Sequence, residues 1–149
     1  MPVTKRKTKI LFLCTGNSCR SQMAEGWARH LKGDIIDACS AGVEKHGINP
    51  LAVKVMAEAG VDISSQKSKV VTELPTQEFD WIITLCGHAD ETCPALPGRK
   101  IHRGFDDPPK LALKYNDEEE ILKCYRKVRD QIRDFIDSFP QSLSNGSAD

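Results

Sequence analysis

The sequence has no excess of either charge and no long apolar run. Lysine and arginine together number 21, as do aspartate and glutamate, so the formal net charge is zero. Proteins that bind nucleic acid or anionic membranes usually carry basic surfaces, so this balance argues against both tasks. No apolar run approaches the roughly 20 residues that a membrane-spanning helix needs. We therefore expect no nucleic-acid partner and no membrane partner.

Cysteine is too scarce for a disulfide scaffold. Six cysteines in 149 residues make up about 4%, below the roughly 8–10% of such scaffolds. The basic residues 5–7 are followed by only the short apolar run 10–13 and by no small-residue cleavage site, which does not fit a signal peptide. We therefore expect a cytoplasmic protein, in which thiols stay reduced unless they are catalytic, redox-active or metal-binding.

Apolar runs alternate along the chain with segments of helical periodicity. A length of 149 residues fits a single domain spanning 1–149. The expected strands span residues 9–14, 34–41, 79–86 and 99–102. The expected helices span residues 22–32, 51–59 and 117–139, with a shorter one within 64–75.

This alternation predicts an α/β protein, a three-layer sandwich whose central four-stranded parallel sheet has helices on both faces. The ordered core is expected over about 8–138, with 142–149 as a polar tail. Functional residues in such folds gather at the carboxyl ends of the strands. Cys14, Cys86 and the pair Asp106-Asp107 lie at or just after strand ends, so we expect them at one edge of the sheet.

The segment after the first strand, CTGNSCRS, places Cys14 and Arg20 six positions apart, between a strand and a helix. Gly16 and Asn17 tolerate the positive φ of a tight loop. The loop N–H groups and the helix N-terminus would converge on an anion, and Arg20 offers two donors to its oxygens. The same field is expected to lower the pKa of Cys14 and make it a nucleophilic thiolate. The predicted oxyanion-binding residues are Thr15, Gly16, Asn17, Ser18, Cys19, Arg20 and Ser21.

One alternative applies to this loop. A bare C-x5-R spacing recurs by chance, so an ordinary strand–turn–helix with a buried cysteine has the same pattern.

Cys19 is expected to point into the packing and to have a structural role. Cys39 lies in an apolar strand and Cys124 in the long helix, and both are expected to be inert packing residues.

An acid is expected at the same edge. A leaving oxygen departs more easily when it is protonated, and a carboxylic acid can supply that proton. In Asp106-Asp107-Pro108, the proline holds Asp107 in an extended conformation. The alternative is a plain polar turn, in which Asp-Pro is common.

Cys86 and Cys93 form a C-x6-C pair that starts at this edge. On a helix, residues seven apart lie about 10 Å apart along the axis, whereas a disulfide needs Cα atoms within about 7 Å. The two thiols can bond only if the segment unwinds, which suggests a redox relay. A metal site and two incidental buried thiols are the alternatives, although C-x6-C lacks the usual ligand spacing of a metal site.

The stretch CTGNSCRSQMAEGWA (14–28) resembles the active-site signature of thioredoxin-coupled arsenate reductases, which share the low-molecular-weight tyrosine phosphatase fold. SAGVEKHGINP (40–50), TLCGHADETCP (84–94), GFDDP (104–108) and RKVRDQI (126–132) are similar too, in order and spacing. The resemblance covers roughly 8–138. The loop alone would be shared with true phosphatases, and the added Cys86/Cys93 pair singles out the reductases.

The resemblance implies a role for each matching residue. Cys14 would attack arsenate held by Arg20 and the loop amides, Asp107 would be the general acid, and Cys86 and Cys93 would relay the disulfide to thioredoxin. Ser21 would steady the Cys14 thiolate. No bound cofactor and no metal are implied, and a monomer is expected.

Two positions depart from the family pattern. Some members hold an alkali cation with groups that match Asn17, Glu25, Ser40 and a further carboxylate, and the last position is Lys69 here. The lysine ammonium would take the place of the cation, so no potassium dependence is expected. Arg103 stands where an aromatic residue is expected.

Two rival functions remain open at this point. A low-molecular-weight tyrosine phosphatase would want aromatic residues after the acid, whereas Asp107 is followed by Pro108, Pro109, Lys110 and Leu111. A non-catalytic oxyanion-binding or metal-responsive protein would have little use for a nucleophile beside an acid.

Overall fold

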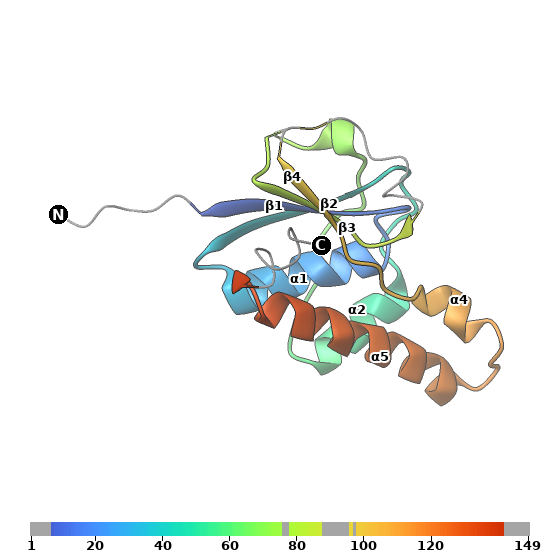
Figure 1. Cartoon of the computed structure of the whole chain (residues 1–149). Coiled ribbons are helices and arrows are strands. Elements are labelled where there is room, and N and C mark those ends of the chain that lie inside the picture. The colour runs from blue at the N-terminus through green and yellow to red at the C-terminus, as the bar shows by residue number, and fades with distance from the viewer. Residues whose placement is uncertain (1–6, 76–77, 88–95, 97, 142–149) are drawn as a thin grey trace.

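A four-stranded parallel sheet forms the centre of the molecule (Figure 1). The computed structural model describes residues 7–75, 78–87, 96 and 98–141. The sheet order is β2-β1-β3-β4. The strands are β1 (Thr8–Cys14), β2 (Ile36–Gly42), β3 (Trp81–Thr84) and β4 (Arg99–His102). All three neighbouring pairs are parallel, so the strands end at the same edge.

The two faces of the sheet are covered differently, as Figure 1 shows. The helices are α1 (Arg20–Lys32), α2 (Pro50–Glu58), α4 (Pro108–Ala112) and α5 (Glu118–Asp137). The larger core cluster packs α1, α2 and α5 against one face, where Ile10 and Phe12 of β1 point. On the other face, Leu11 and Leu13 pack under the segment that includes a short 3₁₀ helix, Val71–Glu73. The alternation along β1 follows from the two-residue period of a strand.

Two helices begin directly after a residue whose side chain caps the helix N-terminus. Asn49 caps α2, because its side-chain oxygen accepts from the N–H groups of Leu51 and Ala52. Asp117 caps α5 by accepting from Glu120. No apolar helix long enough to cross a membrane occurs in the described part of the chain.

The bounds of β2, β3 and α5 differ from the sequence-based prediction by one to two residues at each end, and three further details differ. The first helix begins at Arg20, two residues earlier than expected, and its N-cap is Cys19, whose side chain makes no capping hydrogen bond. The helix α4 was not predicted, although Pro108 and Pro109 suit the first turn of a helix. The short helix expected within 64–75 is a single 3₁₀ turn.

Candidate functional site

Hydrogen bonds beyond the strands bring three chain segments together at the carboxyl edge of the sheet. The N–H of Leu85 donates to the carbonyl of Leu13 at 2.9 Å, and the N–H of Phe105 donates to the carbonyl of Leu85 at 3.1 Å. The residues that follow, Cys14 and Cys86, therefore lie beside one another. The expectation from parallel strand ends is confirmed for these two cysteines.

The loop between β1 and α1 turns its carbonyl groups away from the space that it encloses. Each carbonyl from residue 14 to residue 19 accepts a hydrogen bond, at 2.9 to 3.2 Å. The donors, in the same order, are the N–H groups of Val43, Glu44 and His46, the Nε2 of Gln22, and the N–H groups of Asn49 and Met23. A peptide group whose carbonyl points outward points its N–H the other way, so the loop presents N–H groups to its centre.

Asn17 fixes the tightest point of this loop. Its φ is +47°, in the left-handed region that asparagine tolerates better than most residues. Its Oδ1 accepts from Gln22 Nε2 at 2.9 Å and from the N–H of Lys69 at 2.8 Å, and its Nδ2 donates to Ser21 Oγ at 2.9 Å. All of these side chains except Lys69 are buried, so the loop shape is set before any ligand arrives.

Arg20 is aimed at the same centre. Its Nη1 donates to the carbonyl of Phe105 at 2.9 Å, and its Nη2 lies 3.7 Å from Asp107 Oδ1. The side chain is only 11% exposed. Its Nε is buried without a hydrogen-bond partner among the described residues. A buried donor without a partner is costly, and an oxyanion in the loop would supply one.

A cavity of about 340 Å³ is lined by most of the predicted site residues, but not by Asn17, Ser21 or Cys86. Its lining includes Cys14, Arg20 and Asp107. Asp107 has an extended backbone, with φ −85° and ψ 110°, at the start of α4. The nucleophile, the cation and the acid expected from the sequence therefore face one space.

The pair of thiols changes the expected acidity of Cys14. Cys86 hydrogen-bonds the Cys14 side chain and, together with burial, raises the pKa of the Cys14 thiol. Arg20 and the N–H of Thr15 act in the opposite direction but are outweighed. The expectation of a lowered pKa was wrong for this arrangement, because it did not include a second thiol in contact. Thr15 Oγ1 also lies 3.1 Å from Cys86 Sγ, a contact that the sequence did not indicate.

The other cysteines are separate from this pair. Cys19 is buried in the larger core cluster, as expected. Cys39 and Cys124 are half-buried, so they are less enclosed than expected, and Cys124 Sγ lies 3.5 Å from the carbonyl of Glu120 in its own helix. Cys93 lies outside the described residues.

Alkaline pH is expected to destabilise the fold through Cys19. Burial, with the nearby Asp107 charge, raises the pKa of Cys19 to about 12, whereas an unfolded cysteine titrates near 8.5. The native state therefore favours the protonated thiol, and this stabilisation is full below about pH 8.5 and is lost toward pH 12. In urea unfolding between pH 8 and pH 11, Cys19→Ala should show a flatter decline than the wild type. Parallel profiles would contradict this.

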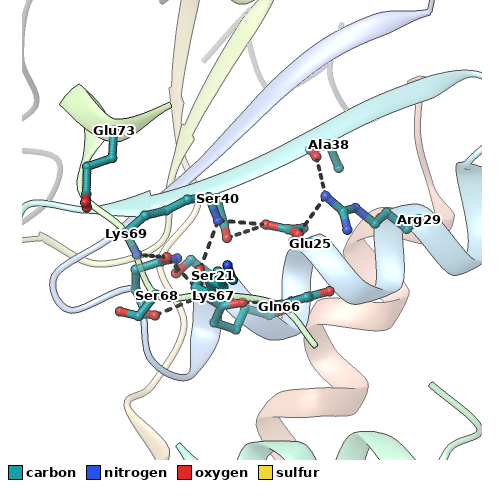
Figure 2. Close-up of polar contacts among 12 residues, drawn as sticks. Ser21, Glu25, Arg29, Ala38, Ser40, Gln66, Lys67, Ser68, Lys69 and Glu73 are labelled. Carbon is teal, nitrogen blue, oxygen red and sulfur yellow. Dashed lines mark hydrogen bonds and ion pairs between the residues drawn. The ribbon is translucent and has the colours of Figure 1, made fainter. Parts of the chain in front are cut away.

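A buried carboxylate lies behind the loop, between two cations (Figure 2). Glu25 Oε2 lies 2.9 Å from Arg29 Nη2, and Glu25 Oε1 lies 3.6 Å from Lys69 Nζ. Ser40 Oγ donates to Glu25 Oε1 at 2.6 Å. Lys69 thus touches both Asn17, through its N–H, and Glu25, through its ammonium. Across the described parts of the chain, no group of three or more histidine, cysteine, aspartate or glutamate side chains is placed to hold a metal ion.

Two parts of the site were not identified from the sequence. His46 lines the cavity, and its Nε2 lies 2.6 Å from Glu44 Oε2. Its ring packs so close to Gly16 that a Cβ there would meet Nδ1 at 2.3 Å. The Phe105 carbonyl that holds Arg20 is a backbone group, which no residue pattern reveals.

Known proteins are similar to this chain over most of its length. An arsenate reductase of Halalkalibacterium halodurans is 50% identical over 138 residues, which cover 91% of this chain and 97% of that protein. The structure of a thioredoxin-dependent arsenate reductase of Corynebacterium glutamicum is 27% identical with a TM-score of 0.65, covering 94% of this chain and 65% of that one. The structure of a low molecular weight protein tyrosine phosphatase from T. tengcongensis is 26% identical with a TM-score of 0.71, covering 92% and 100%.

The chain is thus similar to these proteins in sequence and in overall structure. Residues 9–147 match the low molecular weight phosphotyrosine protein phosphatase family as a whole. The chain belongs to that family, and its curated relatives at about half identity are arsenate reductases.

Proposed function

We propose that this protein reduces arsenate to arsenite through the thiols of Cys14, Cys86 and Cys93, with thioredoxin as the electron donor. The contact between the Cys14 and Cys86 thiols at the oxyanion site carries the proposal. A phosphatase needs one nucleophilic thiol, whereas a reductase needs a second thiol that can reach the first. The names of the relatives point in the same direction.

The first step is a substitution at arsenic. Dihydrogen arsenate binds to Arg20 and to the loop residues Thr15, Gly16, Asn17, Ser18, Cys19 and Ser21. The Cys14 sulfur attacks arsenic, and Asp107 protonates the departing hydroxide. Cys14 gives up its thiol proton as its sulfur attacks, and that proton replaces the one that Asp107 delivers to the departing hydroxide. The products are a Cys14 thioarsenate ester and one water molecule, and no oxidation state has changed.

The second step transfers two electrons. Cys86 attacks the Cys14 sulfur, the sulfur–arsenic bond breaks, and its electron pair stays on arsenic, which passes from arsenic(V) to arsenic(III). Arsenite leaves with the Cys86 proton, and a Cys14–Cys86 disulfide remains. Thr15 Oγ1, at 3.1 Å from Cys86, is placed to hydrogen-bond the attacking sulfur. Cys93 then attacks Cys86, and the thioredoxin dithiol reduces the Cys86–Cys93 disulfide.

The cycle has consequences for partners and location. Electrons enter and leave through thiols, so the proposal needs no bound cofactor and no metal. A thioredoxin-linked relay requires a reducing compartment, and we place the protein in the cytoplasm as a single-domain monomer.

Lys69 is proposed to replace an alkali cation. Its ammonium lies 3.6 Å from the buried Glu25 carboxylate. The negative charge of Glu25 is therefore balanced without an alkali cation. Wild-type turnover is expected to be equal in potassium chloride and in choline chloride at the same ionic strength. Lys69→Asp should become at least about twofold faster in potassium, because it adds a carboxylate oxygen to a site of oxygen ligands.

The exposed neighbour Lys67 supplies the matched control for this experiment. Lys67→Asp makes the same charge change and should remain indifferent to potassium. Potassium stimulation of the wild type, or equal stimulation of both variants, would contradict the replacement.

The activity is tested by thioredoxin-coupled oxidation of NADPH in the presence of arsenate. The wild type should show arsenate-dependent turnover, and its hydrolysis of p-nitrophenyl phosphate should be slow by comparison. Efficient hydrolysis without arsenate-dependent NADPH oxidation would instead identify a phosphatase. The shared oxyanion loop makes some residual phosphatase activity expected.

A further inference from the structure

A cation is stacked on the loop that leads from β4 to Asp107. The exposed Arg103 has its guanidinium carbon 4.4 Å from the centroid of the Phe105 ring and 5.7 Å from that of Phe135 in α5. Its Nη1 donates to the carbonyl of Gly104 at 2.7 Å. A cation within about 6 Å of an aromatic face is attracted to it. Through its contacts with the Gly104 carbonyl, the Phe105 ring and the Phe135 ring, Arg103 therefore holds this loop against α5.

Phe105 connects this stack to the anion site. Its carbonyl accepts from Arg20 Nη1 at 2.9 Å. Its N–H donates at 3.1 Å to the carbonyl of Leu85, the residue before Cys86. Its ring is buried and lies 6.0 Å from that of Phe135. The orientation of the Arg20 guanidinium thus depends on where the Phe105 peptide is held.

We propose that Arg103 is a positioning residue of the oxyanion site, which holds the Phe105 carbonyl and thereby orients the Arg20 guanidinium. The proposal rests on the oxyanion chemistry proposed above. Arg103 acts through Phe105. An arginine held in place before the anion binds loses less side-chain freedom on binding, so the stack raises anion affinity.

The strand β4 carries a matched stack at its other end. The guanidinium carbon of the exposed Arg99 lies 5.2 Å from the centroid of the Trp81 ring. Arg99 pairs with Trp81 at the start of β3 and β4, whereas Arg103 follows their carboxyl ends. Arg99→Gln therefore removes the same kind of contact at the start of β4 but leaves Phe105 and Arg20 untouched.

The test measures the dissociation constant of inorganic phosphate on the reduced protein by isothermal titration calorimetry. Arg103→Gln should weaken binding by about 2- to 10-fold, the range expected for one cation–π contact. Arg99→Gln should change it by less than about 1.5-fold. Arg103→Lys, which keeps a charge near the ring but not the planar stack, should fall between the wild type and Arg103→Gln. Equal effects of Arg99→Gln and Arg103→Gln would overturn the proposal.

A double-mutant cycle separates positioning from a general loss of stability. In an Arg20→Lys background, Arg103→Gln should have less than about a 1.5-fold effect, because lysine lacks the guanidinium that Phe105 holds. The same fold-loss in both backgrounds would overturn the positioning role. Phosphate binding does not require turnover, so these titrations decide the inference even if the wild type reduces no arsenate.

Discussion

Cys14→Ser is expected to lower arsenate-dependent turnover by a factor on the order of 10⁴ or more, as loss of a covalent nucleophile does in other enzymes. A serine hydroxyl is a far weaker nucleophile, and a bond between oxygen and arsenic offers no sulfur for Cys86 to attack. Both electrons that reduce arsenic must pass through the Cys14 sulfur. The measurement is the thioredoxin-coupled rate with saturating arsenate.

The matched control for this variant is Cys124→Ser. Cys124 is a half-buried thiol in α5, and its Sγ donates to the carbonyl of Glu120 at 3.5 Å. Its substitution should leave the rate within about twofold of the wild type, because surface and half-buried sites away from the chemistry have small effects. Measurable turnover by Cys14→Ser above about one percent of the wild type would show that the first step uses another group.

Asp107→Asn is expected to lower the turnover number by about 10² to 10⁴, the usual contribution of a general acid. The amide keeps the shape of the side chain and its place in the cavity, but it cannot deliver a proton to the departing hydroxide. Phosphate binding should not weaken, because removal of a negative charge from the cavity favours an anion. A loss of turnover with unchanged or tighter phosphate binding would therefore identify the acid.

The neighbouring carboxylate provides the control for Asp107. Asp106 is exposed and lies one residue away. It does not line the 340 Å³ cavity that contains Cys14, although it lines an adjoining cavity of about 630 Å³ together with Arg20 and Asp107. Asp106→Asn removes the same charge and should stay within about threefold of the wild type. Equal losses from the two variants would mean that the loop needs its net charge and not a specific acid.

The residues of the site were predictable because strand ends and loop chemistry are local features. Cys14 ends an apolar run, the Gly16-Asn17 pair marks a tight loop, and Pro108 fixes the backbone of Asp107. These signals need no knowledge of distant parts of the chain. The strand β4 was also predicted from its local sequence, and its predicted bounds match the observed ones.

The acidity of Cys14 was not predictable in the same way. The sequence pattern indicates that the charge of Arg20 lowers the pKa of Cys14. The contact with Cys86, which raises that pKa, joins residues 72 positions apart in the sequence. Its effect depends on the distance between the two sulfurs, which no local pattern gives. The same holds for Phe105, whose carbonyl holds Arg20 through a contact spanning 85 residues. The helix α4 was not predicted because it begins with two prolines, a residue type that is also common in loops.

The central claim is that the thiols react in a fixed order, and a single-turnover experiment on Cys93→Ser tests it most directly. Without Cys93 the relay should stop after one arsenite per protein molecule, with a Cys14–Cys86 disulfide that peptide mass mapping can identify. Cys39 and Cys124 should remain free thiols. Repeated turnover by this variant, or a first disulfide that includes Cys39 or Cys124 in place of Cys86, would contradict the account.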